Sequence, residues 1–219
     1  MTERIFWQDP YLTRLTAQVI AVDGADLVLD RTIFFAFSGG QESDTGRIAG
    51  LTVESARKQE NGSIVYTLPM PHGLQTGQRV EVEIDWPRRY RLMRLHFAAE
   101  LVLELICQRL PGVEKIGAHI AEDKARIDFA WHENVSALFP ELSAAIAAIV
   151  AADHPIRTGF SDEATGRRYW EITGLARVPC GGTHVRSTAE IGPLSLKRRN
   201  VGKGKERIEV SLNHDIGLC

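Results

Sequence analysis

The sequence predicts an α+β fold, in which a small N-terminal β-barrel precedes a two-layer α/β domain. Three observations support this prediction. Short alternating segments separated by turn residues fill the first 85 residues, the apolar period becomes helical at Asp85, and helical and strand-like segments then follow one another without regular βαβ spacing. We therefore expect the barrel over residues 1–85 and the α/β domain over residues 86–219.

The first 85 residues have the pattern of short strands joined by tight turns. Two pairs, Asp23-Gly24 and Asn61-Gly62, are hairpin signals because both central positions of a type I′ turn favour such residues. Short strands with turn residues between them are typical of small barrels. The alternating segments lie at residues 14–22, 26–30, 64–68 and 79–84.

A long helix is predicted to follow. Asp85 is expected to cap it, with Pro87 in the first turn, and Pro111-Gly112 is expected to end it. Cys107 lies in the apolar part of this segment, and we expect it in the core. Apolar side chains recur along one helical face at Leu92, Leu95, Ala99, Val102, Ile106 and Leu110.

The rest of the chain mixes both periods. We expect strand-like alternation at residues 118–129, an alanine-rich helix at 135–151, a strand at 169–178 and a last strand at 208–212.

Composition excludes several classes of protein. The chain is 44% hydrophobic, but no apolar run approaches the ~20 residues of a membrane span, and the N-terminus has no signal-peptide pattern, so we expect a cytoplasmic protein. Its three cysteines, Cys107, Cys180 and Cys219, are too scattered for a disulfide framework. The segment Gly202-Lys203-Gly204-Lys205 is no Walker motif, and we expect no ATP site.

Four potential metal ligands occur as two pairs. His96 and Glu100 are four apart on one face of the predicted long helix, and Cys180 and His184 are four apart in a Gly-rich turn. Alone, each pair has an ordinary explanation. The first would be a pair of polar side chains on the helix surface, and the second a buried thiol beside a hydrogen-bonded histidine. Together the two imidazoles, the thiolate and the carboxylate form a ligand set that suits zinc.

Four motifs carry a resemblance to the editing domain of alanyl-tRNA synthetases. They occur in the family order and span nearly the whole chain, and the chain is most similar to the freestanding, AlaX-type editing proteins. Residues 178–185, followed by 188–192, resemble the second metal motif; residues 91–101 resemble the first, a His-x-x-x-His on a helix; and residues 29–35 and 38–46 resemble the Gly-rich motif of the barrel.

The resemblance implies hydrolysis of mischarged tRNA(Ala), usually carrying serine and sometimes glycine, in a zinc-binding editing domain at residues 86–219. By the same resemblance, His96, Glu100, Cys180 and His184 are the metal ligands, and Thr32 and Gln41 face the bound amino acid. Gly39 and Gly40 are expected to bind the substrate because glycine lets the backbone approach a ligand closely. The chain departs from the family pattern at two positions. Glu100 replaces the second helix histidine, and Ser38 replaces the first of three glycines.

Glu100 leaves three alternatives open. If it coordinates zinc, as its place in the motif favours, the site becomes formally neutral and a weaker Lewis acid. If it stays outside the ligand shell, the fourth position is open and the carboxylate becomes a candidate general base. In the third alternative the site is degraded and empty.

Basic residues cluster near the end of the chain, although the net charge is −2. Six of them lie between residues 197 and 207 against one acid, Glu206, and another basic stretch covers residues 88–91 with Arg94 one turn on. A local patch is enough to attract an RNA backbone, and the alternative is simply a solvated loop and helix face. In the loop-like later stretch we expect tRNA backbone contacts from Lys197, Arg198, Arg199, Lys203 and Lys205.

The leading functional hypothesis is therefore a freestanding deacylase of mischarged tRNA(Ala), most of all Ser-tRNA(Ala). Two alternatives remain: a metal-dependent hydrolase of another aminoacyl ester, and a tRNA-binding protein that has lost catalysis. The sequence leaves the oligomeric state open.

Overall fold

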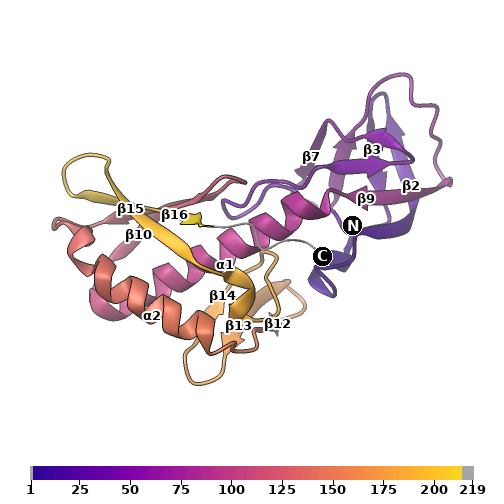
Figure 1. Ribbon diagram of the computed structural model, residues 1–219. Helices are drawn as coiled ribbons and strands as arrows, with labels where there is room; N and C mark the ends of the chain where they lie inside the picture. Colours follow the sequence, from indigo (N-terminus) through magenta and orange to yellow (C-terminus); the bar gives the residue numbers. More distant parts are fainter. Residues whose placement is uncertain (1, 214–219) are drawn as a thin grey trace. The chain divides into compact units, whose positions relative to one another are not determined.

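The computed structural model describes residues 2–213, so Cys219 and the last positions of the predicted second domain lie outside the described residues. The chain forms two compact units (Figure 1): the first contains Met1–Ser38 and Glu42–Tyr90, and the second contains Gly39–Gln41 and Arg91–Cys219. The chain enters the second unit briefly at Gly39–Gln41, returns to the first, and crosses for the last time inside a long helix, α1 (Trp86–Arg109). The predicted division at residue 85 stays a prediction.

The first unit contains a curled antiparallel sheet of seven strands (Figure 1). Gly24 and Gly62 have positive φ at the two predicted hairpin turns, and these hairpins are confirmed. The strand order has two ends, β6 and β7, so the pairing of the described residues gives a sheet with edges and does not establish a closed barrel. In spatial order the strands are β6 (Leu51–Thr52), β5 (Gly46–Ile48), β9 (Arg79–Ile84), β2 (Arg14–Asp23), β3 (Asp26–Leu29), β8 (Ile64–Thr67) and β7 (Ser55–Lys58).

Near its beginning the chain adds β1 (Glu3–Arg4), a 3-10 turn η1 (Ile5–Trp7) and β4 (Arg31–Thr32), with β1 and β4 paired in parallel. The side chains of β9 show how alternation builds the core of this unit. Val80, Val82 and Ile84 are buried, whereas the charged residues between them face outward or lie at the surface. Each such buried aliphatic side chain contributes roughly 1.5–3 kcal/mol relative to leaving it exposed.

The predicted long helix is confirmed as α1. The Asp85 carboxylate accepts a hydrogen bond from the backbone N–H of Arg88 at 3.2 Å, which is the expected N-terminal cap. The apolar face is buried from Leu92 to Ile106. The prediction for Cys107 is wrong: it is exposed, because one residue beyond Ile106 the helix has turned by about 100°.

The basic stretch around residues 88–91 is largely internal, which corrects its interpretation as a solvated or RNA-facing surface. The Arg89 side chain is fully buried, and its Nε donates to the Asp44 carboxylate at 2.8 Å. Arg88 pairs with Glu42 at 2.7 Å. Arg94 is 2% exposed and donates to the Ile191 carbonyl at 3.0 Å. These cations are used to fix backbone and helix positions.

The second unit contains a four-stranded antiparallel sheet in the order β10 (Glu114–Ile120), β11 (Ala125–Ala130), β16 (Lys205–Leu212) and β15 (Leu194–Asn200). The predicted strand at 118–129 is thus a hairpin, β10 with β11. The predicted helix at 135–151 begins as a 3-10 turn, η2 (Val135–Leu138), and continues as α2 (Phe139–Ala151), which lies along β15 (Figure 1).

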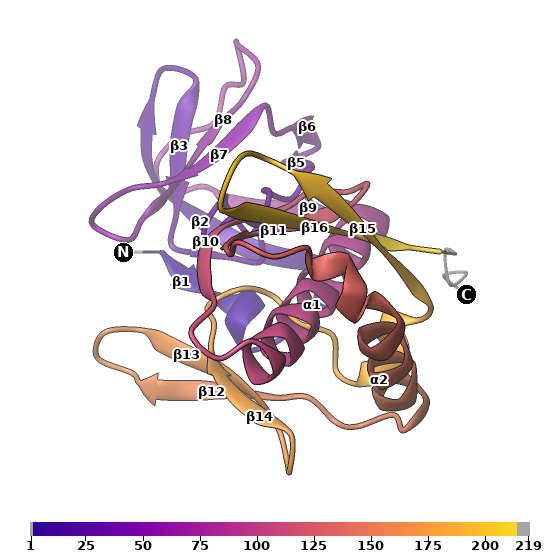
Figure 2. The same ribbon diagram turned by 90° about the vertical axis from the view of Figure 1, so that its left-hand side faces the viewer.

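A smaller sheet of three strands completes this unit (Figure 2): β12 (Arg157–Asp162), β13 (Arg167–Ile172) and β14 (Ala176–Pro179). It is followed by a 3-10 turn, η3 (Thr188–Ile191). The predicted single strand at 169–178 is wrong, because Gly174, at φ 80°, reverses the chain between β13 and β14. The fold class is α+β, as predicted. Between residues 2 and 213, no helix has the length and apolarity that a membrane span requires.

Candidate metal centre

The two predicted halves of the metal site come together within the second unit. His96 lies on α1, and Cys180 and His184 lie in the turn that follows β14. Ligand atoms of these three residues all lie within 4.8 Å of one another, and Cys180 Sγ is 3.4 Å from His96 Nε2. Both imidazoles are buried and the thiol is partly buried. Residues 84 positions apart in sequence therefore form one compact group of donors.

Strand pairing and ring packing position the Cys180 turn. The backbone N–H of Cys180 donates to the Arg168 carbonyl at 2.9 Å, which extends the β13–β14 ladder by one residue. Phe97, next to His96 on α1, packs its ring edge-on against Trp170 of β13, with centroids 5.0 Å apart, and against His184 at 5.8 Å. The helix and the small sheet are thus held together immediately beside the three donors.

Gly182 is required by the close approach of His96. A Cβ atom at this position would lie 2.0 Å from Cε1 and 2.5 Å from Nδ1 of the imidazole. At the neighbouring Gly181 a Cβ would meet nothing within 4 Å. The second glycine of the motif therefore has a steric function that the first does not share.

Gln41 orients the His96 ring. The Nδ1 atom of His96 lies 2.6 Å from the amide oxygen of Gln41, whose amide nitrogen donates to the Thr183 hydroxyl at 2.9 Å. Because the amide oxygen only accepts hydrogen bonds, Nδ1 carries the proton and Nε2 is directed toward Cys180. Outer partners of this kind fix the tautomer of a ligating histidine.

A backbone hydrogen bond between the Gly-rich motif and β10 fixes the position of Gln41. The Gly40 carbonyl accepts a hydrogen bond from the Ile120 N–H at 2.7 Å. Gly40 has φ 88°, and a Cβ there would lie 2.5 Å from the Ala118 carbonyl oxygen. Gly39 also has positive φ but open space around it. The close approach seen at Gly40 is therefore to a neighbouring strand, and it brings the buried Gln41 to the three candidate metal ligands.

Glu100 borders the group of three. One carboxylate oxygen lies 3.5 Å from His96 Nε2 and 3.9 Å from Cys180 Sγ. The other accepts a hydrogen bond from the indole N–H of Trp170 at 3.1 Å. Trp170 thus holds Glu100 so that its other oxygen faces the three donors. From this position Glu100 could be a fourth ligand or could stay just outside the ligand shell.

Electrostatics favour the charged forms of these side chains. Burial alone would keep the Cys180 thiol protonated, but the positive charge of His96 and further interactions with both imidazoles lower its pKa to about 6. Burial likewise opposes protonation of His96, yet the Cys180 thiolate and Glu100 raise the pKa of His96 to about 10. Burial opposes ionisation of Glu100, while His96, followed by Trp170, lowers the pKa of Glu100 to about 2.

The donors fit a metal ion. The Nε2 atom of His184 is buried without a hydrogen-bond partner among the described residues, and leaving such an atom unsatisfied is costly. A cation held jointly with Cys180 and His96 would satisfy it. One thiolate and two imidazoles are compatible with zinc.

Thr32, predicted to bind the substrate, lies in the first unit. Its side chain is fully buried, and its hydroxyl oxygen accepts hydrogen bonds from the Tyr66 hydroxyl at 2.6 Å and from the Phe34 N–H at 2.9 Å. Because both lone pairs of the Thr32 hydroxyl oxygen accept these hydrogen bonds, a further partner can be bound only through the hydroxyl hydrogen.

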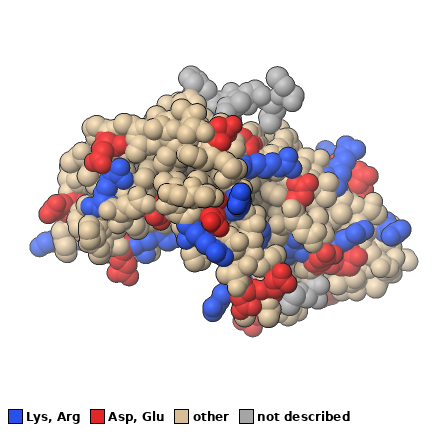
Figure 3. All heavy atoms as spheres, turned by 90° about the horizontal axis from the view of Figure 1, so that it is seen from below, with Lys and Arg blue, Asp and Glu red and all other residues tan. Residues whose placement is uncertain are grey.

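The basic cluster at residues 197–207 forms a hairpin, which corrects the expected loop. Lys197, Arg198 and Arg199 belong to β15, Lys205 begins β16, and Lys203 lies in the turn. Alternation sends neighbouring side chains to opposite faces, so Arg198 points away from its neighbours and binds the buried Glu206 at 2.5 Å. Arg199 pairs with Glu209 at 3.2 Å. On the face seen in Figure 3, cationic and anionic side chains likewise lie interspersed.

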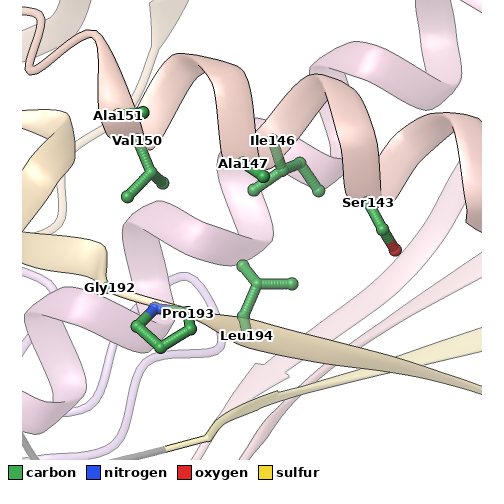
Figure 4. Close-up of a pocket in the computed structure, with 8 residues that line it drawn as sticks. All are labelled: Ser143, Ile146, Ala147, Val150, Ala151, Gly192, Pro193 and Leu194. Atoms are coloured by element: carbon green, nitrogen blue, oxygen red, sulfur yellow. The ribbon is translucent and has the colours of Figure 1, made fainter.

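A separate apolar cavity of about 320 Å³ lies between α2 and the start of β15 (Figure 4). Ile146 and Val150 of α2 and Leu194 of β15 line it, and Ser143 supplies a hydroxyl. Its lining contains no titratable side chain, so it lacks the groups that ester hydrolysis needs.

Sequence reasoning missed three residues of the centre: Thr183, Trp170 and Phe97. Thr183 is inside the second metal motif and was within reach, because a hydroxyl next to a ligand is a common outer partner. Phe97 adjoins His96 on the helix. Trp170 gave no signal, since its contact with Glu100 depends on the pairing of β13 with β14.

Comparisons with known proteins agree with this geometry. Residues 9–88 match the family model described as class II (A) tRNA synthetases. Residues 173–209, which contain Cys180 and His184, match the model described as the second additional domain of threonyl and alanyl tRNA synthetases.

Individual relatives cover almost the whole chain. The alanyl-tRNA editing protein AlaX-M of Pyrococcus horikoshii is 32% identical over 216 residues, which cover 97% of this chain and 98% of that protein. AlaX-M of Methanosarcina barkeri is 33% identical over 243 residues, covering 97% and 99%. The alanine–tRNA ligase of Methanococcus aeolicus is 27% identical over an alignment 248 residues long, gaps included. This alignment covers 99% of this chain but 27% of the ligase. The chain therefore belongs to the AlaX-M family of alanyl-tRNA editing proteins.

Proposed function

We propose that this protein hydrolyses the ester bond of mischarged tRNA(Ala), with Ser-tRNA(Ala) as its main substrate, at a zinc centre held by His96, Cys180 and His184. Membership of the editing family makes the protein an aminoacyl-tRNA deacylase, which is a hydrolase. The observation that carries the zinc proposal is the convergence of one sulfur and two nitrogen donors within 4.8 Å of one another.

The chain's own residues prepare this centre in defined ways. Gln41 holds the proton on His96 Nδ1, so Nε2 is the atom that gives up its proton and coordinates when a metal binds. Cys180 ionises readily, because its pKa is lowered to about 6, and so supplies a thiolate at neutral pH. Zinc in a site of this type supplies Lewis-acid catalysis of ester hydrolysis.

Glu100 is proposed as the fourth ligand, with Trp170 holding its second oxygen; the alternative is a general base outside the ligand shell. The variant Glu100→His separates the two. If Glu100 is a ligand, the change raises the formal charge of the site by one and should speed deacylation at neutral pH. If Glu100 is the base, the rate should fall roughly 10²–10⁴-fold. Equal rates and equal zinc affinity would remove Glu100 from the site altogether.

Selection of serine is assigned to Thr32. Gly39 and Gly40 are proposed separately as backbone contacts of the substrate. The Thr32 hydroxyl hydrogen is its remaining donor, and a serine hydroxyl is a matching acceptor. A site built to pair with a hydroxyl discriminates against a substrate that lacks one. Thr32→Val should therefore reduce the preference for serine over alanine without changing zinc content.

Binding of the tRNA backbone is assigned to the β15–β16 hairpin. Lys197, Arg199, Lys203 and Lys205 are exposed there. Arg198 also belongs to the proposed set, although its guanidinium is engaged by Glu206, and we expect a smaller contribution from it. Lysine and arginine contacts to phosphate position an RNA without reading its sequence.

The test of the proposal is deacylation by the purified zinc-loaded protein. We expect release of serine from Ser-tRNA(Ala) and little release of alanine from Ala-tRNA(Ala). Hydrolysis only of other aminoacyl esters would point to a different substrate. Salt-sensitive binding of tRNA without turnover would identify a binding protein and would refute the enzymatic proposal.

A further inference from the structure

Three side chains form one row across the small sheet of the second unit: Phe160, Arg168 and Cys180. Phe160 of β12 lies directly opposite Arg168 of β13, and the Cys180 N–H donates to the Arg168 carbonyl. Residues opposite one another in an antiparallel ladder project to the same face. The row therefore runs from a metal-binding residue, through a guanidinium, to an aromatic ring.

The face that carries this row is the face that builds the metal centre. Trp170 lies two residues after Arg168 on β13, so its side chain projects to the same side, and its indole donates to Glu100. Tyr169 and Arg167, between and beside these residues, project to the opposite side. The alternating burial of β13, in which Arg168, Trp170 and Ile172 are buried, agrees with this assignment.

The outer two members of the row have the chemistry of a nucleotide site. The guanidinium carbon of Arg168 lies 5.1 Å from the centroid of the Phe160 ring. Arg168 is 7% exposed, whereas Phe160 is one of the large apolar side chains that remain at the surface, at 40% exposure. Unpaired bases of single-stranded RNA stack on aromatic rings, and arginine forms bidentate hydrogen bonds with phosphate.

The spacing of the row corresponds to one nucleotide. Neighbouring strands are ~4.8 Å apart, so Arg168 lies about one such step from Cys180 and Phe160 about two. In an aminoacyl-tRNA the reactive ester is on the ribose of the terminal adenosine, whose phosphate and base are attached to that same ribose. With the ester at the metal centre, a phosphate near Arg168 and a base near Phe160 are within reach.

We propose that Phe160 and Arg168 bind the 3′-terminal adenylate of the tRNA, with the adenine stacked on Phe160 and its 5′-phosphate hydrogen-bonded to Arg168. This inference rests on the proposed function in one respect, namely that an RNA 3′ end enters the centre. It adds a recognition site for the invariant part of the substrate, distinct from the residues assigned to the amino acid and to the tRNA body.

The test is binding of uncharged acceptor-stem hairpins that end either in CCA or in CC. For the zinc-loaded wild type we expect roughly tenfold tighter binding of the CCA hairpin, as one stacked base typically provides. Phe160→Ala and Arg168→Met should each bring this ratio close to one, and Phe160→Tyr, which keeps an aromatic ring, should preserve it. Zinc content should not change in the Phe160 variants.

Arg167→Met is the matched control, because Arg167 is the exposed neighbour of Arg168 on the opposite face of β13. It should leave the ratio unchanged. If Arg168→Met does not fold, the inference is tested by Phe160→Ala alone. This variant should fold, since Phe160 is partly exposed. Equal binding of both hairpins by the wild type, or an unchanged ratio in Phe160→Ala, overturns the inference. Because no hydrolysis is measured, a protein that prefers the CCA end but does not deacylate Ser-tRNA(Ala) contradicts the proposed function and leaves this site standing.

Discussion

The candidate metal-binding group, formed by His96, Cys180 and His184, and the β15–β16 hairpin use charged and polar side chains in opposite ways. In the metal-binding group, residues far apart in sequence converge: His96 Nε2 and Cys180 Sγ lie 3.4 Å apart, and Gln41 and Trp170 hold the side chains of His96 and Glu100. In the hairpin, neighbours in sequence are separated, because Arg198 turns inward to Glu206 while Arg199 stays at the surface beside Glu209.

The difference shows what a cluster in sequence means. A cluster of donors in a Gly-rich turn keeps its side chains together, since the turn folds around one point. A cluster of cations on a strand is divided between two faces. We therefore expect substitutions in the metal-binding group to have large effects on one centre, and substitutions in the hairpin to have small effects that divide between stability and RNA binding.

The largest effect is expected from Gly182→Ala. The new methyl group would lie 2.0 Å from Cε1 of His96 and would displace that ligand. We expect zinc affinity to fall by about 100-fold or more, because even loss of an outer partner costs 10–100-fold. Gly181→Ala is the control, since its methyl group meets nothing within 4 Å and should leave affinity unchanged. Competition with a chromophoric chelator measures both, and equal affinities in the two variants would contradict the steric explanation.

A smaller effect is expected from Gln41→Leu. This change removes the acceptor that holds His96 Nδ1 at 2.6 Å and leaves the ring free to rotate. Zinc affinity should fall roughly 10–100-fold. Thr183→Val removes only the partner of Gln41 and should cost less. If Thr183→Val weakens zinc binding more than Gln41→Leu does, Gln41 is not the direct support of the His96 ring.

Trp170→Phe should change the titration of Glu100. The indole N–H is one of the interactions that lower the pKa of Glu100, so its removal should raise that pKa. In metal-free protein, the carboxyl ¹³C resonance of Glu100 should titrate at higher pH in the variant than in the wild type. An unchanged titration would show that Trp170 only fills space beside α1.

Neutralising the exposed lysines of the hairpin should weaken RNA binding moderately. With Lys197, Lys203 and Lys205 changed to Gln, we expect weaker binding of tRNA and a flatter salt dependence, by somewhat less than one unit of slope for each phosphate that the variant no longer neutralises. Zinc content should stay the same. Arg198→Met is the comparison and should mainly lower stability, since it leaves Glu206 buried without its partner. Binding with unaltered affinity and salt slope in the triple variant would leave the hairpin as a solvated surface.

The smallest expected effect is the acid dependence contributed by Glu206. The hydrogen bonds from Arg198 and then its charge lower the pKa of Glu206 in the folded state. The resulting stability is present above the pKa of glutamate in the unfolded chain and is lost as pH falls through the lower folded value. Glu206→Gln should therefore lose less stability between neutral and acidic pH than the wild type in denaturant titrations. A parallel decline in both proteins would refute this linkage.

Much of the centre could be predicted from the sequence because its information is local. His96 belongs to a helix with a clear apolar face and cap, and Cys180 and His184 share one turn. Their residue types and spacings can therefore be recognised from the sequence, without knowledge of the fold. The rest depends on strand register. The hairpin at Gly174, which places Trp170 beside Glu100, could not be distinguished from a continuous strand by alternation alone. The inward turn of Arg198 also follows from pairing with β16, which no local pattern specifies.

The central claim is that a single zinc ion held by His96, Cys180 and His184 is required for removal of serine from tRNA(Ala). The most direct measurement is the rate of Ser-tRNA(Ala) deacylation during titration of metal-free protein with zinc. We expect no activity at the start, a rise to a plateau at about one equivalent per chain, and no rise for Cys180→Ala at the same concentrations. Full activity in thoroughly chelated protein, or turnover by zinc-loaded Cys180→Ala equal to that of the wild type, would contradict the claim.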